Sequence, residues 1–225
     1  MTKKLVVGIV DYGMGNTRSV ANALAALGIE PLIGADHSLL KSADALILPG
    51  VGAFDAAMWN LARQKLDDPL RDWIFSGRPL LGICLGMQLL VRESEEGSAC
   101  PGLGVIDGRV QALRPAAGLR VPHVGWNSIT STGNGLFSGI ADGSHCYFDH
   151  GYHVQCDASL ACAHFEHGGR YIAALRSGSL FGTQFHPEKS QRHGMSLLRN
   201  FIRYSRLSLM PGAWREMAMA EAAFA

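Results

Sequence analysis

The feature that most constrains the fold is a repeated pattern in the first 91 residues, where short apolar runs alternate with amphipathic segments. Apolar strands are predicted at residues 5–10, 30–33, 45–48 and 80–83. Helices are predicted from a cap at Asn16 to Gly28, and at residues 54–63, 69–76 and 85–91. Strands that alternate with helices form parallel βαβ units, which bind ligands beyond the carboxyl ends of the strands.

The pattern changes after residue 101. Alternating segments predict strands at residues 105–113, 127–129, 160–165, 171–176 and 180–184, followed by a last helix at 194–207. We expect these strands to extend the same sheet. The predicted fold class is α/β, with a mostly parallel sheet flanked by helices and a smaller mixed or antiparallel β extension. Residues 1–207 form one domain, and residues 208–225 form a tail that is either disordered or a short helix with Trp214 and Met217 on one face.

Composition excludes several classes of protein. Of the 225 residues 48% are hydrophobic, and 20 Lys and Arg residues nearly balance 19 Asp and Glu residues. This argues against a disordered chain and against an electrostatic binder of nucleic acid. The apolar runs are too short for a signal peptide or a membrane span. The five cysteines are odd in number and lack CxxC spacing, so we expect reduced thiols in a soluble cytoplasmic protein with no membrane partner.

The first chemical motif is a cysteine at a strand-to-helix junction. Residues 82–86 read Gly-Ile-Cys-Leu-Gly, which is the nucleophile-elbow pattern with sulfur in place of the serine oxygen. A sharp turn there presents Cys84 at the edge of the sheet, and the flanking glycines leave room for the bend. The helix N-terminus that follows favours a thiolate. The alternative is that Cys84 is a buried apolar side chain of the core.

The second motif pairs a histidine with a carboxylate two residues later. On an extended segment, His186 and Glu188 point to the same side, so the carboxylate can orient the imidazole. Alone, the pair could be an ordinary surface His and Glu at a strand end. Together with Cys84 it forms a Cys-His-Glu triad of nucleophile, base and orienting group.

The third motif is the glycine-rich turn Pro-Gly-Val-Gly at residues 49–52. Acyl transfer needs two N–H donors for the developing oxyanion. We expect one from Leu85, the residue after the nucleophile, and the other from Val51 or Gly52. The alternative is an ordinary strand-to-helix turn.

Three motifs of the chain together resemble those of a known family. The motifs PGVGAF, GICLGMQLL and FHPEKS, in this order and spacing, are similar to those of the class I glutamine amidotransferases. Within that superfamily, DYGMGN at residues 11–16, VPHVGWN at 121–127 and Lys-Ser at 189–190 resemble the glutaminase subunits of imidazole glycerol phosphate synthases. The resemblance implies hydrolysis of glutamine and delivery of ammonia to a cyclase subunit in a heterodimer of histidine biosynthesis, with no cofactor and no metal.

The resemblance also implies residue roles. Cys84 is the nucleophile, His186 the acid and base, and Glu188 the orienting group. Contacts to glutamine are implied for Gln88, Glu96, Gly151 and Tyr152, and contacts to the cyclase for Tyr12, Asn16, Trp126, Tyr147 and Lys189, with Tyr147 at the ammonia exit. The family commonly has Tyr-Phe-x-His-Ser-Tyr where residues 147–152 read Tyr-Phe-Asp-His-Gly-Tyr, so Gly151 can contact glutamine only through its backbone.

Two other functions stay open from the residues. A metal-binding module is one, because residues 145–167 hold eight histidines and cysteines, although none shows the usual metal-ligand spacing. A cysteine hydrolase of related architecture, acting on peptides or γ-glutamyl conjugates, is the other. The predicted glutaminase core leaves no residues for a second catalytic domain, so we expect the ammonia acceptor on another polypeptide.

Overall fold

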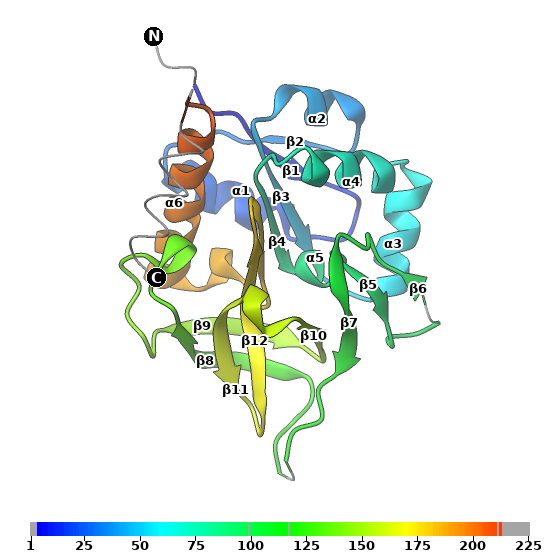
Figure 1. Ribbon diagram of the computed structural model, residues 1–225, viewed down its shortest axis with the longest axis vertical. Helices are drawn as coiled ribbons and strands as arrows, with labels where there is room; N and C mark the ends of the chain where they lie inside the picture. Colours follow the sequence, from blue (N-terminus) through cyan, green and yellow to red (C-terminus); the bar gives the residue numbers. More distant parts are fainter. Residues whose placement is uncertain (1–3, 99, 117, 211, 213–225) are drawn as a thin grey trace.

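The computed structural model describes residues 4–98, 100–116, 118–210 and 212, and within them a nine-stranded sheet runs through the molecule (Figure 1). The strand order is β2-β1-β3-β4-β13-β12-β11-β8-β9. The first five strands in this order are parallel, namely β2 (Leu32–Gly34), β1 (Val7–Val10), β3 (Ala45–Gly50), β4 (Leu80–Cys84) and β13 (Leu180–Thr183). The other four continue it antiparallel, namely β12 (Arg170–Ser177), β11 (Ala161–Glu166), β8 (His123–Ser131) and β9 (His145–His150).

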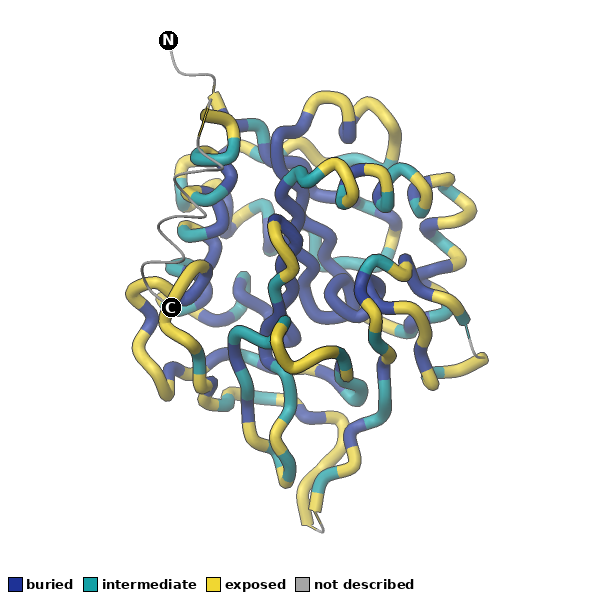
Figure 2. The backbone as a smooth tube through the Cα atoms, viewed as in Figure 1, coloured by how far each residue is buried: buried dark blue, intermediate teal, exposed yellow. Residues whose placement is uncertain are grey.

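Helices cover both faces of the parallel part, and the side chains between the layers form the core. One face packs against α1 (Thr17–Ala26) and α6 (Gln191–Ser208). The other packs against α2 (His37–Ser42), α3 (Phe54–Arg63), α4 (Asp67–Phe75) and α5 (Leu85–Gln88). The parallel strands are buried along their whole length except at β2, which is the edge (Figure 2). Continuous apolar runs, rather than alternating ones, are what strands covered on both faces require.

Sequence patterns predicted most of these elements. The helix at 54–63 has the predicted bounds, and Asn16 caps α1 by accepting a hydrogen bond from the Ser19 N–H. The prediction omitted α2, although Asp36 caps it through the N–H groups of Ser38 and Leu39. It also omitted β9 and three short strands at residues 91–94, 100–101 and 152–156. These elements are too short, or too polar on one face, to show a clear period.

The predicted extension of one sheet is wrong for residues 105–113. That segment forms β7 in a second, four-stranded sheet of order β10-β7-β5-β6, built from β10 (Tyr152–Cys156), β7 (Ile106–Ala112), β5 (Val91–Ser94) and β6 (Cys100–Pro101). The chain bends at Gly151 between β9 and β10, so consecutive strands enter different sheets.

The helix predicted at 85–91 is also too long, because α5 ends at Gln88. The carbonyl groups of residues 89–91 accept hydrogen bonds from the N–H groups of residues 103–106 instead of continuing the helix. The chain can therefore enter β5 at Val91. A helix of a single turn has little macrodipole, so α5 offers little of the charge stabilisation that the sequence predicted from a longer helix.

The described part of the chain contains no helix that is both long and apolar enough to cross a membrane. All five cysteines are free thiols, as predicted. Most of the tail predicted at 208–225, including Trp214 and Met217, lies outside the described residues.

The tightest packing in the fold lies where α5 leaves β4. A Cβ atom on Gly86 would lie 1.8 Å from the carbonyl oxygen of Leu48, and one on Gly82 would lie 2.6 Å from the carbonyl oxygen of Gly86. Both neighbours are backbone atoms, which cannot move aside as a side chain can. Gly86 is therefore required by the short distance between α5 and β3, and Gly82 by the short distance between β4 and α5.

We expect Gly86→Ala to lower the free energy of unfolding by at least about 2 kcal/mol, because the added methyl group must push the backbone of β3 away from α5. Urea denaturation followed by circular dichroism measures this change. Gly34→Ala is the matched control, since its Cβ would meet only the Leu39 side chain at 3.6 Å. Equal stability of the two variants would contradict this account of the elbow.

Candidate active site

Cys84 lies at the end of β4, a parallel strand between β3 and β13, and begins the turn into α5. Its backbone has φ 54° and ψ −110°, a left-handed conformation that non-glycine residues rarely adopt. Strain of this kind persists only where surrounding packing enforces it. The side chain is 5% exposed. Its sulfur lies 3.7 Å from the Gln184 amide nitrogen and 3.8 Å from the Asp149 carbonyl oxygen.

His186 and Glu188 follow β13, the strand next to β4. The imidazole Nδ1 lies 2.9 Å from a carboxylate oxygen of Glu188, and both side chains are buried. The predicted pairing occurs, but the predicted reason is wrong, because Pro187–Lys189 is a 3-10 turn rather than a continuation of the strand. The turn brings the two side chains together by folding the chain back.

The backbone of this turn is fixed by a serine that sequence reasoning missed. The Ser190 hydroxyl donates to the His186 carbonyl oxygen at 2.6 Å and accepts from the Tyr147 N–H at 3.0 Å. The His186 N–H in turn donates to the Tyr147 carbonyl oxygen at 2.9 Å. Strand β9 thus holds the histidine in place through two hydrogen-bonded links.

The charge state of His186 is set by two opposing effects. Burial lowers its pKa, but Cys84 and Glu188 beside the ring outweigh burial and raise it to about 10. The ring therefore carries a positive charge at neutral pH. Its Nε2 atom is buried and has no hydrogen-bond partner among the described residues, so it is available to exchange a proton with Cys84 beside it.

A pocket of about 240 Å³ opens at Cys84. It brings together eight of the residues predicted from the sequence, namely Val51, Gly52, Cys84, Leu85, Gln88, Glu96, Gly151 and Tyr152. The structure adds Pro122, Asp149 and His150 to its wall. His186 and Glu188 do not line it and are buried beside Cys84. The pocket therefore lies beyond the carboxyl ends of the parallel strands, where the βαβ pattern places a ligand.

The polar side chains of the pocket are already oriented. The Gln88 amide nitrogen donates to the Tyr152 carbonyl oxygen at 3.0 Å and to the Gln184 side-chain oxygen at 3.1 Å. One oxygen of Glu96 accepts from the Phe54 N–H at 3.0 Å. Burial raises the pKa of Glu96 in spite of this hydrogen bond. A carboxylate and an amide on one wall suit a ligand that carries an ammonium group and a polar tail.

The predicted oxyanion donors differ in whether their N–H groups are already engaged in a hydrogen bond. Leu85 is the first residue of α5, a position whose N–H has no partner within the helix. The Val51 N–H instead donates to the Met14 carbonyl oxygen at 3.2 Å. Gly52 has φ +99°, which gives the turn a conformation that suits glycine. Val51 can act as a donor only after its bond to Met14 is released.

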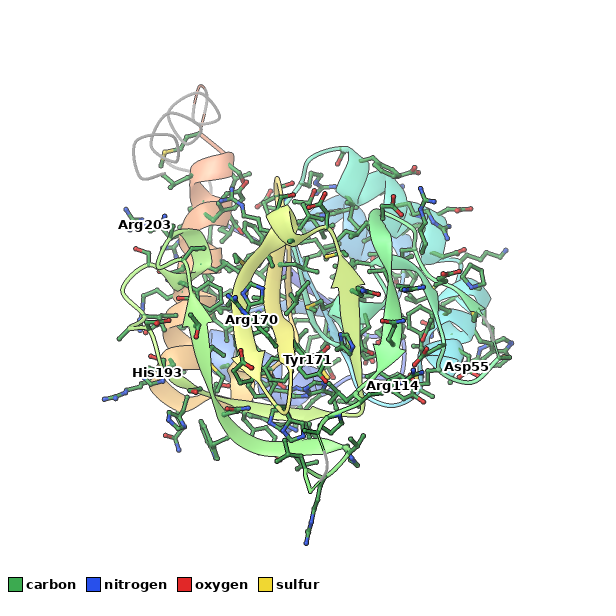
Figure 3. All side chains as sticks on the ribbon, turned by 60° about the horizontal axis from the view of Figure 1, so that its bottom comes forward. Asp55, Arg114, Arg170, Tyr171, His193 and Arg203 are labelled. Atoms are coloured by element: carbon green, nitrogen blue, oxygen red, sulfur yellow. The ribbon has the colours of Figure 1, made fainter. Side chains whose placement is uncertain are left out.

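The residues predicted to contact a partner fall into two groups. Trp126, Tyr147 and Lys189 form a surface cluster, in which Trp126 is 46% exposed and packs edge-on against Tyr147 with ring centroids 6.0 Å apart. The Lys189 ammonium lies 5.4 Å from the centre of the Tyr147 ring. Figure 3 brings this end of the molecule forward and shows β8 and β9 crossing it.

Tyr12 does not belong to this surface, which corrects the prediction made for it. Its side chain is 1% exposed and lies in the core, because the loop after β1 folds it inward beside Gly50. Burial and, to a lesser extent, Cys84 raise the pKa of Tyr12. Asn16 is half-buried, and its side chain is engaged in capping α1.

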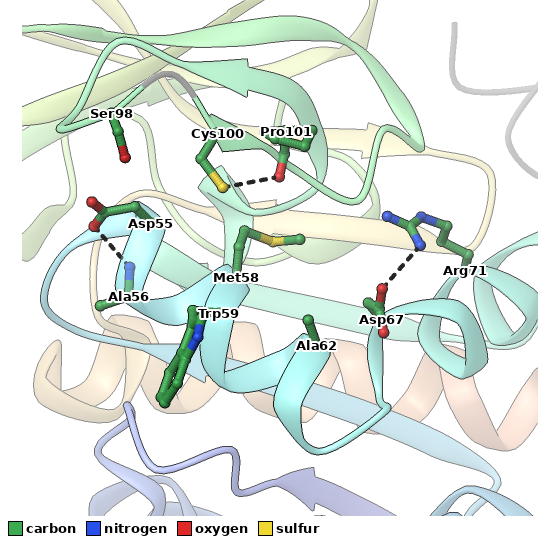
Figure 4. Close-up of a pocket in the computed structure, with 10 residues that line it drawn as sticks. All are labelled: Asp55, Ala56, Met58, Trp59, Ala62, Asp67, Arg71, Ser98, Cys100 and Pro101. Carbon is green, nitrogen blue, oxygen red and sulfur yellow. Dashed lines mark hydrogen bonds and ion pairs between the residues drawn. The ribbon is translucent and has the colours of Figure 1, made fainter.

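A larger hollow of about 550 Å³ lies between α3, α4 and β6 and contains none of the predicted site residues (Figure 4). Its charged groups are satisfied by their own neighbours: Arg71 pairs with Asp67 and Asp68, and Asp55 accepts from the Ala56 N–H. The described residues contain no group of three or more His, Cys, Asp and Glu side chains that could hold a metal ion.

Residues 8–204 match the family Glutamine amidotransferase class-I. The chain is 46% identical to the imidazole glycerol phosphate synthase subunit HisH of Rhodopirellula baltica, over 87% of this chain and 96% of that protein. It is 48% identical to the HisH subunit of Symbiobacterium thermophilum, over 87% and 92%. The chain belongs to the class I glutamine amidotransferases, in the HisH family.

Solved structures share the fold of this amidotransferase. A glutamine amidotransferase crystal structure superposes with a TM-score of 0.70 at 23% identity, covering 88% of this chain and 98% of that one. PurLQS from Thermotoga maritima gives 0.70 at 21% identity, covering 90% and 99%. The α/β class predicted from the sequence is thereby confirmed.

Sequence reasoning missed several polar groups of this amidotransferase site. Gln184 is fully buried two residues before His186 and donates to the sulfur of Cys84. Its position directly after an apolar strand, next to the histidine motif, was a signal that could have identified it. Asp149 contributes a backbone carbonyl, which no side-chain pattern reveals.

Glu188→Gln is expected to lower the pKa of His186, because the ring loses a carboxylate that stabilises its charged form. In the native enzyme the ring should stay protonated through neutral pH and lose its proton near pH 10. NMR titration measures both values, with His186→Asn used to assign the signal. We also expect glutamine turnover to fall at least about tenfold. An unchanged pKa would show that another group orients the ring.

Proposed function

We propose that this chain is the glutaminase subunit of an imidazole glycerol phosphate synthase. It hydrolyses glutamine to glutamate and ammonia through a Cys84 thioester and delivers the ammonia to a cyclase subunit. The cyclase forms imidazole glycerol phosphate and aminoimidazole carboxamide ribonucleotide, a lyase step of histidine biosynthesis in the cytoplasm. The observation that carries the proposal is the strained Cys84 at the pocket with the buried His186–Glu188 pair beside it.

In the first half of the reaction, His186 holds the proton of the Cys84 thiol and the sulfur attacks the side-chain carboxamide carbon of glutamine. The carbonyl oxygen becomes an oxyanion. His186 then gives its proton to the departing nitrogen, which leaves as ammonia, and a γ-glutamyl thioester remains. Glu188 keeps the imidazole in the orientation that directs Nε2 toward the reacting atoms.

In the second half, a water molecule gives one proton to His186 and attacks the thioester carbonyl. The tetrahedral intermediate collapses, the sulfur leaves and takes back the proton, and glutamate is released. Both halves develop negative charge on the same oxygen, so one pair of N–H donors serves both. Leu85 supplies one donor, and Val51 or Gly52 the other.

Glutamine binding uses the opposite wall of the pocket. Glu96 accepts hydrogen bonds from the substrate ammonium group. Both N–H groups of Gln88 already donate to Tyr152 and Gln184, so Gln88 contacts the amino-acid end of glutamine through its side-chain oxygen. Gly151 and Tyr152 contribute backbone groups from the turn between β9 and β10. The missing hydroxyl at Gly151 leaves this wall without a side-chain donor that relatives commonly have.

The partner follows from the chemistry of ammonia. In neutral water ammonia is mostly protonated and no longer nucleophilic, so it needs a covered route to its acceptor. We therefore propose that a cyclase subunit covers the pocket, in a heterodimer with a closed route for ammonia past Tyr147. Trp126 and Lys189 offer an aromatic anchor and a charged contact beside that route. Asn16 contributes from the loop after β1.

Cys84→Ala tests the proposed reaction. We expect the variant to lose glutamine hydrolysis, because no sulfur remains to form the thioester, while its complex with the cyclase still makes product from added ammonia. Glutamate release and imidazole glycerol phosphate formation are measured with purified subunits. A glutamine-shaped diazoketone should label Cys84 among the five cysteines. Loss of both activities, or labelling of another cysteine, would contradict the assignment.

Trp126→Ala and Lys189→Ala test the partner surface. Each removes a contact from the exposed cluster at β8 and β9, so the dissociation constant of the cyclase complex should rise about tenfold or more. Calorimetric titration measures it. Trp59→Ala is the matched control, because Trp59 is 62% exposed on α3 outside the cluster. If all three variants bind equally well, the partner surface lies elsewhere.

A further inference from the structure

A continuous line of hydrogen bonds connects strand β8 with the nucleophile. Its first part begins at the Asn127 side-chain nitrogen, which lies 3.3 Å from Nε2 of His123. Nδ1 of His123 lies 3.2 Å from Nε2 of His150, and Nδ1 of His150 lies 2.7 Å from the carbonyl oxygen of Tyr152. All of these atoms lie between β8, β9 and the first residue of β10.

The second part runs from that carbonyl oxygen to the sulfur. Gln88 donates to the carbonyl oxygen of Tyr152 at 3.0 Å and to the side-chain oxygen of Gln184 at 3.1 Å. The Gln184 side-chain nitrogen lies 3.7 Å from Sγ of Cys84. Each of the two glutamines is 3% exposed or less, so these bonds are shielded from competition by water.

The partners determine where the protons lie. A carbonyl oxygen can only accept, so His150 must carry its proton on Nδ1 and present Nε2 as an acceptor. His123 must then donate from Nδ1, which leaves its Nε2 to accept from Asn127. Every bond from Asn127 to the Tyr152 carbonyl oxygen therefore points in the same direction, and both rings are neutral.

The surroundings of the two rings favour this neutral state. His123 stacks between Phe165 and His167, with ring centroids 5.3 and 4.3 Å away. Burial, with His167 as a smaller cause, lowers the pKa of His123 to about 4. Burial also lowers the pKa of His150 to about 3, and the titratable neighbours that act on it are the histidines His123, His153 and His167. Protonating either ring would place two N–H groups face to face.

We propose that His123, His150 and Gln184 are positioning residues that hold the pocket wall at Tyr152 and the sulfur of Cys84 in reacting geometry. The inference rests on the proposed glutaminase function. The wall is the segment from Asp149 to Tyr152, which runs from the end of β9 into β10, and its Asp149 carbonyl oxygen also contacts the sulfur directly. Without the donation from His150, the Tyr152 carbonyl oxygen and the Gln88 amide lose their fixed orientation.

Strand β8, where this line of hydrogen bonds begins, also has side chains exposed on the surface of the molecule. Side chains of β8 alternate between the two sides of the sheet. His123 is therefore buried, whereas Val124 is 56% exposed and Trp126 is 46% exposed. A partner that contacts Val124 and Trp126 touches the other side of the strand that fixes His123.

The decisive variants keep the shape of the ring or its hydrogen bonds. His123→Phe retains a stacked ring but removes both hydrogen bonds. We expect kcat/KM for glutamine to fall at least about tenfold, since the loss of even one aligned buried hydrogen bond implies this much. His123→Gln offers one acceptor and one donor and should recover activity to within about threefold of the native value. His164→Phe, on β11 outside the line, is the control and should leave kcat/KM unchanged.

Two measurements do not depend on turnover. Nitrogen-15 NMR of the histidine rings should show both His123 and His150 neutral and protonated at Nδ1 from pH 5 to 8. The rate at which iodoacetamide modifies Cys84 should fall at least threefold in Gln184→Met. If the native complex hydrolyses no glutamine, the proposed function fails, and these two measurements still decide the positioning role.

The proposal is overturned if His123→Phe is folded and retains kcat/KM within twofold of the native enzyme. It is equally overturned if either ring titrates above pH 6 or carries its neutral proton on Nε2. Should His123→Phe fail to fold, the NMR spectra of the native chain and the activity of His123→Gln decide the question.

Discussion

The structure depends on how closely the backbone of α5 approaches β3. A Cβ on Gly86 would meet the Leu48 carbonyl oxygen at 1.8 Å, so only glycine permits this contact. The close approach forces the chain to turn within one residue at the end of β4, and Cys84 takes the strained left-handed conformation that results. The position of the sulfur is therefore set by backbone packing, before any side chain of the pocket contacts it.

Once the elbow is fixed, the parallel sheet determines which segments can reach the sulfur. Strands β3 and β13 flank β4, and they deliver the turn at Val51 and the His186 segment to the same edge. The antiparallel strands add the third side, since β9 ends at His150 and the chain bends there into the second sheet. Segments that are far apart in the chain thus line one pocket because their strands end at the same level.

The sequence predicted what depends on local chemistry. We could predict the elbow glycines, the cap at Asn16 and the parallel strands from the sequence, because each depends on a periodic pattern or a steric requirement of nearby residues. The second sheet could not be predicted, because the pairing of β5 with β7 depends on contacts between distant parts of the chain, and neither segment has a sequence pattern that indicates them. For the same reason the roles of Gln184 and Ser190 were missed, and the burial of Tyr12 reversed its predicted exposure.

Two kinds of histidine sit within this one site, and the difference between them is electrostatic. His186 faces a carboxylate and the sulfur, so its charged form is favoured in spite of burial. His123 and His150 face a carbonyl oxygen, an amide and other histidines, so burial prevails and both stay neutral. The site can therefore keep one mobile proton beside the nucleophile while the surrounding hydrogen bonds retain a fixed direction. A second charged imidazole in the wall would reverse that direction and repel the first.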